Sequence, residues 1–111
     1  MKNLKYFFVF VFLSCNKTSS YSEKDFTSIK YYETFSGYNH PLSLISEIRK
    51  EETIHKKAYY IGYFRNNKLM KVEKFLDNDL FFFYEYFYEK DKLVKAILSN
   101  KEGKKTLKIE N

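Results

Sequence analysis

The sequence of residues 58–98 is AYYIGYFRNNKLMKVEKFLDNDLFFFYEYFYEKDKLVKAIL, and this stretch decides the fold. Runs rich in aromatic and β-branched residues alternate with short polar breaks, which is the pattern of β-strands joined by tight turns. The predicted strands, including one beyond this stretch, are Tyr59–Arg65, Lys68–Leu76, Leu80–Glu89, Lys92–Leu98 and Lys104–Ile109. The breaks are Asn66-Asn67, Asp77-Asn78-Asp79, Lys90-Asp91 and the segment 100–103. Because Asn and Asp tolerate turn conformations, we expect an antiparallel meander of about five strands.

The strand pattern also predicts a register, taking 77–79 as a hairpin loop. The predicted pairs are Leu76 with Leu80, Val72 with Tyr84, and Lys71 with Glu85. One predicted face carries Ile61, Tyr63, Met70, Val72, Phe82, Tyr84, Tyr86, Leu93 and Ile97. The other carries Tyr60, Phe64, Leu69, Phe75, Phe81, Phe83, Phe87, Val94 and Leu98. Both faces are largely apolar, so both need cover. The helix and the segment 29–48 can cover one face. The other requires a partner, a second copy of the chain or a tolerance for exposed tyrosine.

The segment before the meander predicts less regular structure. Ile29–Phe35 has the composition of a first strand, and Gly37 and Pro41 indicate a loop after it. Apolar residues between 42 and 48 suggest an extended segment laid across the sheet. Lys50–Lys57 has acidic residues at its start and basic residues at its end, which suits a helix dipole. The predicted class is therefore α+β, mainly β, with one short helix preceding the meander.

The first fifteen residues resemble a bacterial lipoprotein signal. Lys2 and Lys5 precede an unbroken apolar run over 6–13, and Ser14-Cys15 follows it directly. The resemblance implies cleavage before Cys15, a thioether-linked lipid on its sulfur and a palmitate-bearing protein in the cell envelope, with the inner or outer membrane left open. The expected organisation is a signal peptide over 1–14, a lipid-anchored polar tether over 15–28 and a single small antiparallel-sheet domain over 29–111. A buried N-terminal strand over 6–13 is the alternative.

Two further resemblances concern the body of the chain. Tyr60–Lys68 is similar to one MORN repeat, with a weaker copy over Tyr84–Lys92 that lacks the glycine. The bacterial YD-type repeats share this pattern, and general hairpin sequence preferences also account for it. Residues 32–96 resemble a family of small bacterial proteins of unknown function, on the features Phe35-Ser36-Gly37-Tyr38, Pro41-Leu42, Ala58-Tyr59-Tyr60 and Lys74-Phe75-Leu76-Asp77. This resemblance implies a fold and carries no activity.

The residues that catalysis requires are not arranged recognisably in this sequence. The chain has two histidines, His40 and His55, and one cysteine, so we expect no metal and no other cofactor. No phosphate-binding loop, dinucleotide fingerprint or hydrolase elbow occurs. We expect no enzyme and no catalytic residue. The formal net charge is +6. Lysines interleave with aromatic residues, but the run 81–88 lacks the basic-Gly start of an RNA-binding signature, so no nucleic-acid partner is expected.

The remaining functional classes are non-catalytic. Tyr84, Tyr86 and Tyr88 alternate on one predicted face, with Lys95 opposite Tyr86 and Leu93 opposite Tyr88. Tyrosine joins an apolar ring to a polar tip, so these residues are candidates for binding an envelope protein, peptide or glycan. The alternative is that the rings form the core. An inhibitor or immunity-type protein that blocks a toxin or envelope enzyme is the second functional class, and a structural envelope lipoprotein without a discrete ligand is the alternative to both. Lys104, Lys105 and Lys108 are interpreted as guards of an edge strand, with contact to anionic lipid as the alternative.

Overall fold

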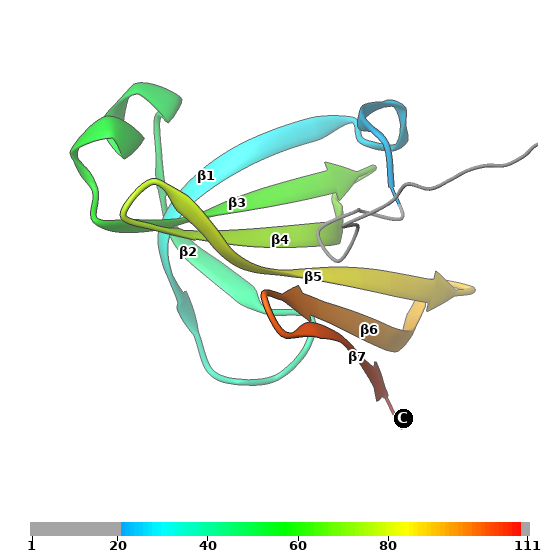
Figure 1. Cartoon of the computed structure of the whole chain (residues 1–111). Coiled ribbons are helices and arrows are strands. Elements are labelled where there is room, and N and C mark those ends of the chain that lie inside the picture. The colour runs from blue at the N-terminus through cyan, green and yellow to red at the C-terminus, as the bar shows by residue number, and fades with distance from the viewer. Residues whose placement is uncertain (1–20, 110–111) are drawn as a thin grey trace, which may run out of the picture.

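The computed structural model describes residues 21–109, which form one antiparallel sheet of seven strands. The strands are β1 (Ser28–Ser36), β2 (Ser43–Ile48), β3 (Ala58–Arg65), β4 (Lys68–Leu76), β5 (Asp79–Glu89), β6 (Lys92–Asn100) and β7 (Gly103–Lys108). Their order in the sheet is β2-β1-β3-β4-β5-β6-β7 (Figure 1). The five predicted strands of the meander are therefore present. Ile29–Phe35 lies within β1, and the extended segment 43–48 joins the sheet as an additional edge strand.

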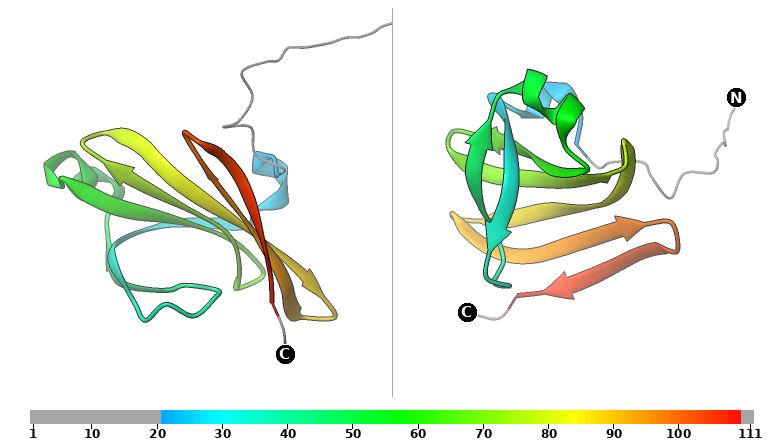
Figure 2. Two further views of the ribbon diagram at one scale, coloured as in Figure 1. Left: turned by 60° about the horizontal axis from the view of Figure 1, so that its bottom comes forward. Right: turned by 90° about the vertical axis from the view of Figure 1, so that its left-hand side faces the viewer.

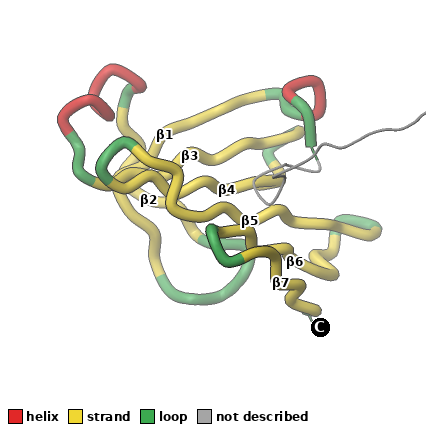
Figure 3. Tube along the Cα trace, viewed as in Figure 1, coloured by secondary structure: helices red, strands yellow, loops and turns green. Residues whose placement is uncertain are grey.

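The predicted helix over Lys50–Lys57 is not an α-helix. Residues Lys50–His55 form a 3-10 helix, η4, and residues Glu23–Asp25 form a second one, η3. These are the only helical segments among the described residues (Figure 3). The backbone N–H of Arg49 donates to the Glu52 carboxylate over 2.8 Å, and Lys56 N–H donates to the Thr53 carbonyl. These bonds close two short turns between β2 and β3. A segment of this length is too short to recover the free-energy cost of starting an α-helix, so it stays in 3-10 geometry. The described part of the chain is thus mainly β.

Three consecutive hairpins share one construction. Their turns are Asn66-Asn67, Asp77-Asn78 and Lys90-Asp91, and every one of these six residues has a positive φ angle. Such two-residue turns match the right-handed twist of the flanking strands. In each hairpin the strand after the turn then carries one extra residue, which shifts the register by one position. The extra residues are Met70, Phe81 and Val94.

These bulges correct part of the predicted register. Lys71 pairs with Glu85 and Val72 with Tyr84, as predicted. Leu76, however, lies opposite Asp79, because the loop contains two residues in place of three. The two predicted faces are also mixed, because a one-residue shift moves every later side chain to the other face. The inner face, toward which the sheet curls, carries Tyr60, Phe64, Leu69, Val72, Phe82, Tyr84, Tyr86, Leu93 and Leu98. The outer face carries Ile61, Tyr63, Phe83, Phe87 and Ile97.

The inner face is covered by the N-terminal half of the chain. The loop 37–42 and β2, which we call the flap, curl over it (Figure 2), and Leu42 and Leu44 pack among the core side chains. Gly62 permits this close approach, because a Cβ atom there would lie 2.8 Å from Leu44 Cδ1. Burial in this layer is nearly complete at Val72, Tyr86 and Ala96, which are 0 % exposed. The flap thus supplies the cover that the sequence analysis requires for one face.

The outer face is covered by residues 21–27, which we call the strap. The Tyr21 ring stacks on Phe87 with 5.4 Å between ring centroids, and Phe26 lies 5.0 Å from Tyr63. An ion pair of 3.0 Å joins Asp25 to Arg65. These residues fall in the segment 15–28 that the sequence predicts as a tether, and in the structure they pack against the sheet. Residues 1–20, including the predicted signal and Cys15, lie outside the described part of the chain.

Tyr86 joins the flap, the sheet and the strap. Its hydroxyl oxygen accepts the backbone N–H of Leu42 at 3.1 Å and lies 2.9 Å from His40 Nδ1. Its carbonyl accepts the Tyr21 hydroxyl proton at 2.7 Å. Burial raises the pKa of the Tyr86 phenol well above its ordinary value. The hydroxyl therefore stays protonated, and its proton is available to the Nδ1 atom of a neutral His40.

The Tyr86→Phe substitution tests this junction. It removes the hydroxyl and leaves the buried Leu42 N–H without its acceptor, so the free energy of unfolding should fall by about 1–3 kcal/mol. Urea denaturation measures the change. Tyr84→Phe is the matched control, because the Tyr84 hydroxyl has no hydrogen-bond partner among residues 21–109. Equal effects of the two substitutions would contradict a special role of Tyr86.

The protonation of His40 gives a second prediction. Burial lowers the pKa of His40 below its ordinary value of 6.5, so the unfolded chain takes up a proton first as the pH falls. The free energy of unfolding should therefore decrease below about pH 6.5, down to the lowered pKa of the folded state. Urea denaturation at about pH 7.5 and about pH 5.5 measures this decrease. The loss of unfolding free energy between the two pH values should be smaller in the His40→Gln variant. An equal loss in the variant and the wild type would show that the loss does not come from His40.

Candidate ligand-binding cavity

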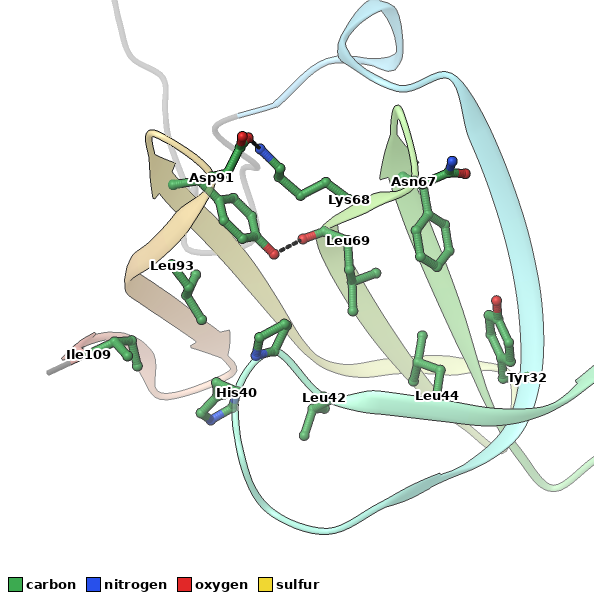
Figure 4. A pocket seen from close by; sticks show the side chains of 13 residues that line it. Tyr32, His40, Leu42, Leu44, Asn67, Lys68, Leu69, Asp91, Leu93 and Ile109 are labelled. Carbon is green, nitrogen blue, oxygen red and sulfur yellow. Dashed lines mark hydrogen bonds and ion pairs between the residues drawn. The ribbon is translucent and has the colours of Figure 1, made fainter. Parts of the chain in front are cut away.

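A cavity lies where the β3–β4 and β5–β6 hairpins separate. The last β4–β5 pair at this end is Lys71 with Glu85, so the first residues of β4 and the last residues of β5 are not paired in register. Side chains bridge the opening. The Tyr88 hydroxyl donates to the Leu69 carbonyl at 2.6 Å, and Lys68 forms an ion pair with Asp91 (Figure 4). The separation of the strands thus opens the inner face at one end while these bonds hold its rim.

Polar and apolar atoms contribute almost equally to the surface of this cavity, whose volume is about 600 Å³. Seven of its thirteen lining residues have apolar side chains. These come from the flap, from the sheet and from the end of the chain, and they are Pro41, Leu42, Leu44, Phe64, Leu69, Leu93 and Ile109. Figure 4 shows Leu93 and Ile109 on one side and Leu42 and Leu44 on the other. Cavities of this size and lining are typical of small-molecule sites, which occur often in the mouths of curled sheets and barrels.

The polar groups of the cavity gather at its rim. Lys68 Nζ lies 5.0 Å from the centre of the Tyr88 ring and bonds Asp91, whose pKa is lowered by the hydrogen bond from Lys68. Burial raises the pKa of Tyr88 to about 12, so its hydroxyl is a donor at neutral pH. Asn67 lies beside Lys68, and His40 faces the opposite side. A bound molecule would thus contact aliphatic side chains and, at one end of the rim, a pair of opposite charges.

The predicted binding tyrosines lie together on the inner face, in unequal environments. Tyr86 is 0 % exposed and belongs to the core. Tyr84 stacks on Tyr86 at 6.0 Å, and its ring lies 4.7 Å from that of His40. Tyr88 alone of the three lines the cavity. The alternation of these residues on one face is as predicted, and Tyr86 has no exposed surface to offer a ligand.

Lys95 does not join this group. It lies opposite Phe87, not opposite Tyr86, because Val94 is the extra residue of the β5–β6 hairpin. Its ammonium group sits 4.9 Å from the centre of the Phe87 ring, on the outer face. The predicted pairing of Leu93 with Tyr88 is confirmed, because these two positions lie between the bulge and the turn. The structure thus separates Lys95 from the tyrosines by the thickness of the sheet.

The contact between Lys68 and Asp91 at the rim was not predicted from the sequence. The two residues are 23 positions apart. Lys68 begins β4 directly after the Asn66-Asn67 turn and Asp91 belongs to the Lys90-Asp91 turn, and residues in and next to turns are ordinarily assigned to solvent. Their proximity follows from the meander, because the Asn66-Asn67 and Lys90-Asp91 turns lie at the same end of the sheet. In a meander, two turns separated by two strands lie at the same end of the sheet. This rule, applied to the Asn66-Asn67 and Lys90-Asp91 turns, would have predicted that Lys68 and Asp91 lie close together.

The outer face holds buried charges beneath the strap. Glu85 is 0 % exposed, and Lys71 Nζ lies 3.4 Å from a Glu73 carboxylate oxygen. The Tyr63 hydroxyl donates to Glu73, and burial together with this carboxylate raises the pKa of Tyr63 well above its ordinary range. Lys71 also lies 4.9 Å from the centre of the Phe83 ring. The Lys71–Glu73–Tyr63 contacts hold the outer face together under Tyr21 and Phe26.

Within residues 21–109, no three His, Cys, Asp or Glu side chains gather as a metal ion would require. No helix in that range has the length and apolar character needed to cross a membrane.

One family model matches this chain. Its description is "Family of unknown function (DUF6156)", and the match covers residues 24–111. The matched segment begins in the strap and includes all seven strands, the flap and the cavity lining. Comparisons with curated proteins and with solved structures gave no match. The resemblance inferred from residues 32–96 thus agrees with a small domain of unknown function, and the chain belongs to this family.

Proposed function

We propose that this protein is a lipid-anchored protein of the cell envelope whose sheet domain is a non-catalytic binding module. Its ligand site is the cavity at the open end of the inner face. The observation that carries the proposal is this cavity of about 600 Å³, whose lining combines aliphatic side chains with polar groups and a charged pair at its rim. The ligand that fits this distribution is a small amphipathic molecule with an aliphatic or aromatic part and a polar end.

The rim chemistry supports binding more than catalysis. Lys68 is neutralised by Asp91, and the Tyr88 hydroxyl is bonded to the Leu69 carbonyl. His40 Nδ1 faces the Tyr86 hydroxyl. General acid–base catalysis needs a titratable group within reach of the substrate and poised near neutral pH. The rim groups are instead occupied in holding the hairpins and the flap, so they orient a polar end without transferring its proton.

The anchor is supported by the sequence. The apolar run over 6–13 is too short to span a bilayer as a helix, whereas it suits a cleaved signal. Cys15 follows it, and a multiply acylated cysteine holds a domain firmly on a membrane because each buried CH₂ group contributes about 0.8 kcal/mol. The strap begins at Tyr21, six residues after Cys15. The domain would therefore work close to the membrane surface, where amphipathic ligands are abundant.

A substitution that fills the cavity tests the ligand site. Ile109 lines the cavity and is only partly buried, so Ile109→Trp adds volume there with little strain on the core. It should weaken binding of a dansyl-labelled fatty acid, measured by fluorescence titration, by about tenfold or more. Leu107→Trp is the control, because Leu107 packs against the core from the same edge of the sheet without lining the cavity. Absence of probe binding, or equal weakening by both substitutions, would contradict the site.

The anchor is tested by lipid labelling. Cells that express the wild-type chain or the Cys15→Ala variant are grown with labelled palmitate, and their membranes are then separated. We expect label and membrane association in the wild type, and neither label nor firm membrane association in the variant, because the thioether needs the Cys15 sulfur. An unlabelled wild type with an intact N-terminus would refute the anchor and return residues 6–13 to the fold as a strand.

A further inference from the structure

The outer face of β6 and β7 is a basic surface that the strap leaves uncovered. Lys95 and Lys108 are directly opposite each other, and Lys104 lies opposite Ser99 on the same face. All three lysines are exposed. Neither β6 nor β7 contains an acidic residue. On the neighbouring strand of this face, Glu85 is 0 % exposed, whereas Glu89 is exposed at the end of β5 opposite Lys92, and Glu102 is exposed in the β6–β7 turn. Lys95, Lys104 and Lys108 therefore form a surface with an excess of positive charge, with acids only at its ends.

The strap brings the start of the described chain to this surface. Tyr21 stacks on Phe87, and Lys95 Nζ lies 4.9 Å from the centre of the same Phe87 ring. Tyr21 is six residues after Cys15, and six extended residues span at most about 20 Å. A lipid on Cys15 would thus hold Tyr21 within this distance of the membrane, and with it the Phe87 end of the outer face. The inner face and its cavity lie on the other side of the sheet.

We propose that Lys95, Lys104 and Lys108 form a docking surface for the anionic headgroups of a lipid bilayer. This proposal deepens the proposed function, because it rests on the anchor at Cys15 for its orientation. Contact between the lysines and the bilayer turns the outer face toward the membrane and the flap side away from it. Lysines close to an anionic membrane each strengthen binding about fivefold, and together with an acyl anchor they supply the second of the two signals that stable attachment needs.

The test uses the full chain with Cys15→Ala, which cannot be acylated, so that binding reports the lysines and not the anchor. Partition into phosphatidylglycerol-containing vesicles is compared with partition into pure phosphatidylcholine vesicles by co-sedimentation. The leader, with Lys2 and Lys5, is the same in every variant, so differences between variants report the substituted lysines. Replacing Lys95, Lys104 and Lys108 with Gln should reduce the preference for anionic vesicles roughly 100-fold. Raising the ionic strength from about 0.1 M to about 1 M should abolish the preference, because the screening length shrinks to about 3 Å.

The matched control replaces Lys30, Lys50 and Lys57, which are also exposed and lie on β1 and around η4. It lowers the net charge equally and should change the preference less than about threefold. Equal losses in the two triple variants would overturn the proposal, because they would show a response to net charge alone. Equal binding of the Cys15→Ala chain to both kinds of vesicle would also overturn it.

A second readout reports orientation. Acetylation of lysines in the vesicle-bound chain, located by mass spectrometry, should be slowed at Lys95, Lys104 and Lys108 and unchanged at Lys30, Lys50 and Lys57. Uniform protection or uniform labelling would overturn the docking surface even if the vesicle preference were present. The palmitate experiment is independent of this result, so a failed anchor and a failed docking surface are distinguishable.

Discussion

The side chain and carbonyl of Tyr86 hold the three layers of this molecule together. Its hydroxyl oxygen accepts the Leu42 N–H from the flap, and its carbonyl accepts the Tyr21 hydroxyl from the strap. The residue is 0 % exposed, so these bonds form where an unpaired polar group would be costly. The constraint has a direct consequence for shape. A seven-stranded sheet with free edges remains curled over its inner face because the flap is tied to β5 at this point.

The bulges in the three hairpins determine what the curled sheet encloses. Each bulge moves the later residues of its strand to the other face, so that Leu69 and Val72 both reach the inner layer although three positions separate them. Bulges also increase the local twist of the strands. At the end where β4 and β5 separate, this geometry leaves the cavity, whose rim is held by the bond from Tyr88 to Leu69. The cavity thus results from the register of the strands. The charged pair at its rim forms because the Asn66-Asn67 and Lys90-Asp91 turns lie at the same end of the sheet.

The two faces of the sheet are suited to different environments. The inner face has a cavity under the flap that is lined by both aliphatic and polar side chains, and the outer face of β6 and β7 has exposed lysines beside the strap. A protein held at a membrane surface by a lipid at Cys15 would use both faces at once, with the basic one toward the headgroups. The strap is the element that relates them, because it begins near the basic surface and ends at β1, next to the flap's own strand.

The sequence by itself determined the strand meander, its turns and part of its register. The pairs Lys71–Glu85 and Val72–Tyr84 occur as predicted, because the two-residue turn and the extra residue Phe81 together offset the strands as much as the predicted three-residue loop does. The same local pattern that resembles a small domain of unknown function also indicated that Tyr84, Tyr86 and Tyr88 share a face. Only the tertiary structure decided which face each strand presents, because a bulge is a single extra residue with no distinctive composition. It also decided that Tyr86 is core, that Lys95 lies across the sheet from it, and that Lys68 meets Asp91, since such contacts depend on how distant hairpins pack and curl.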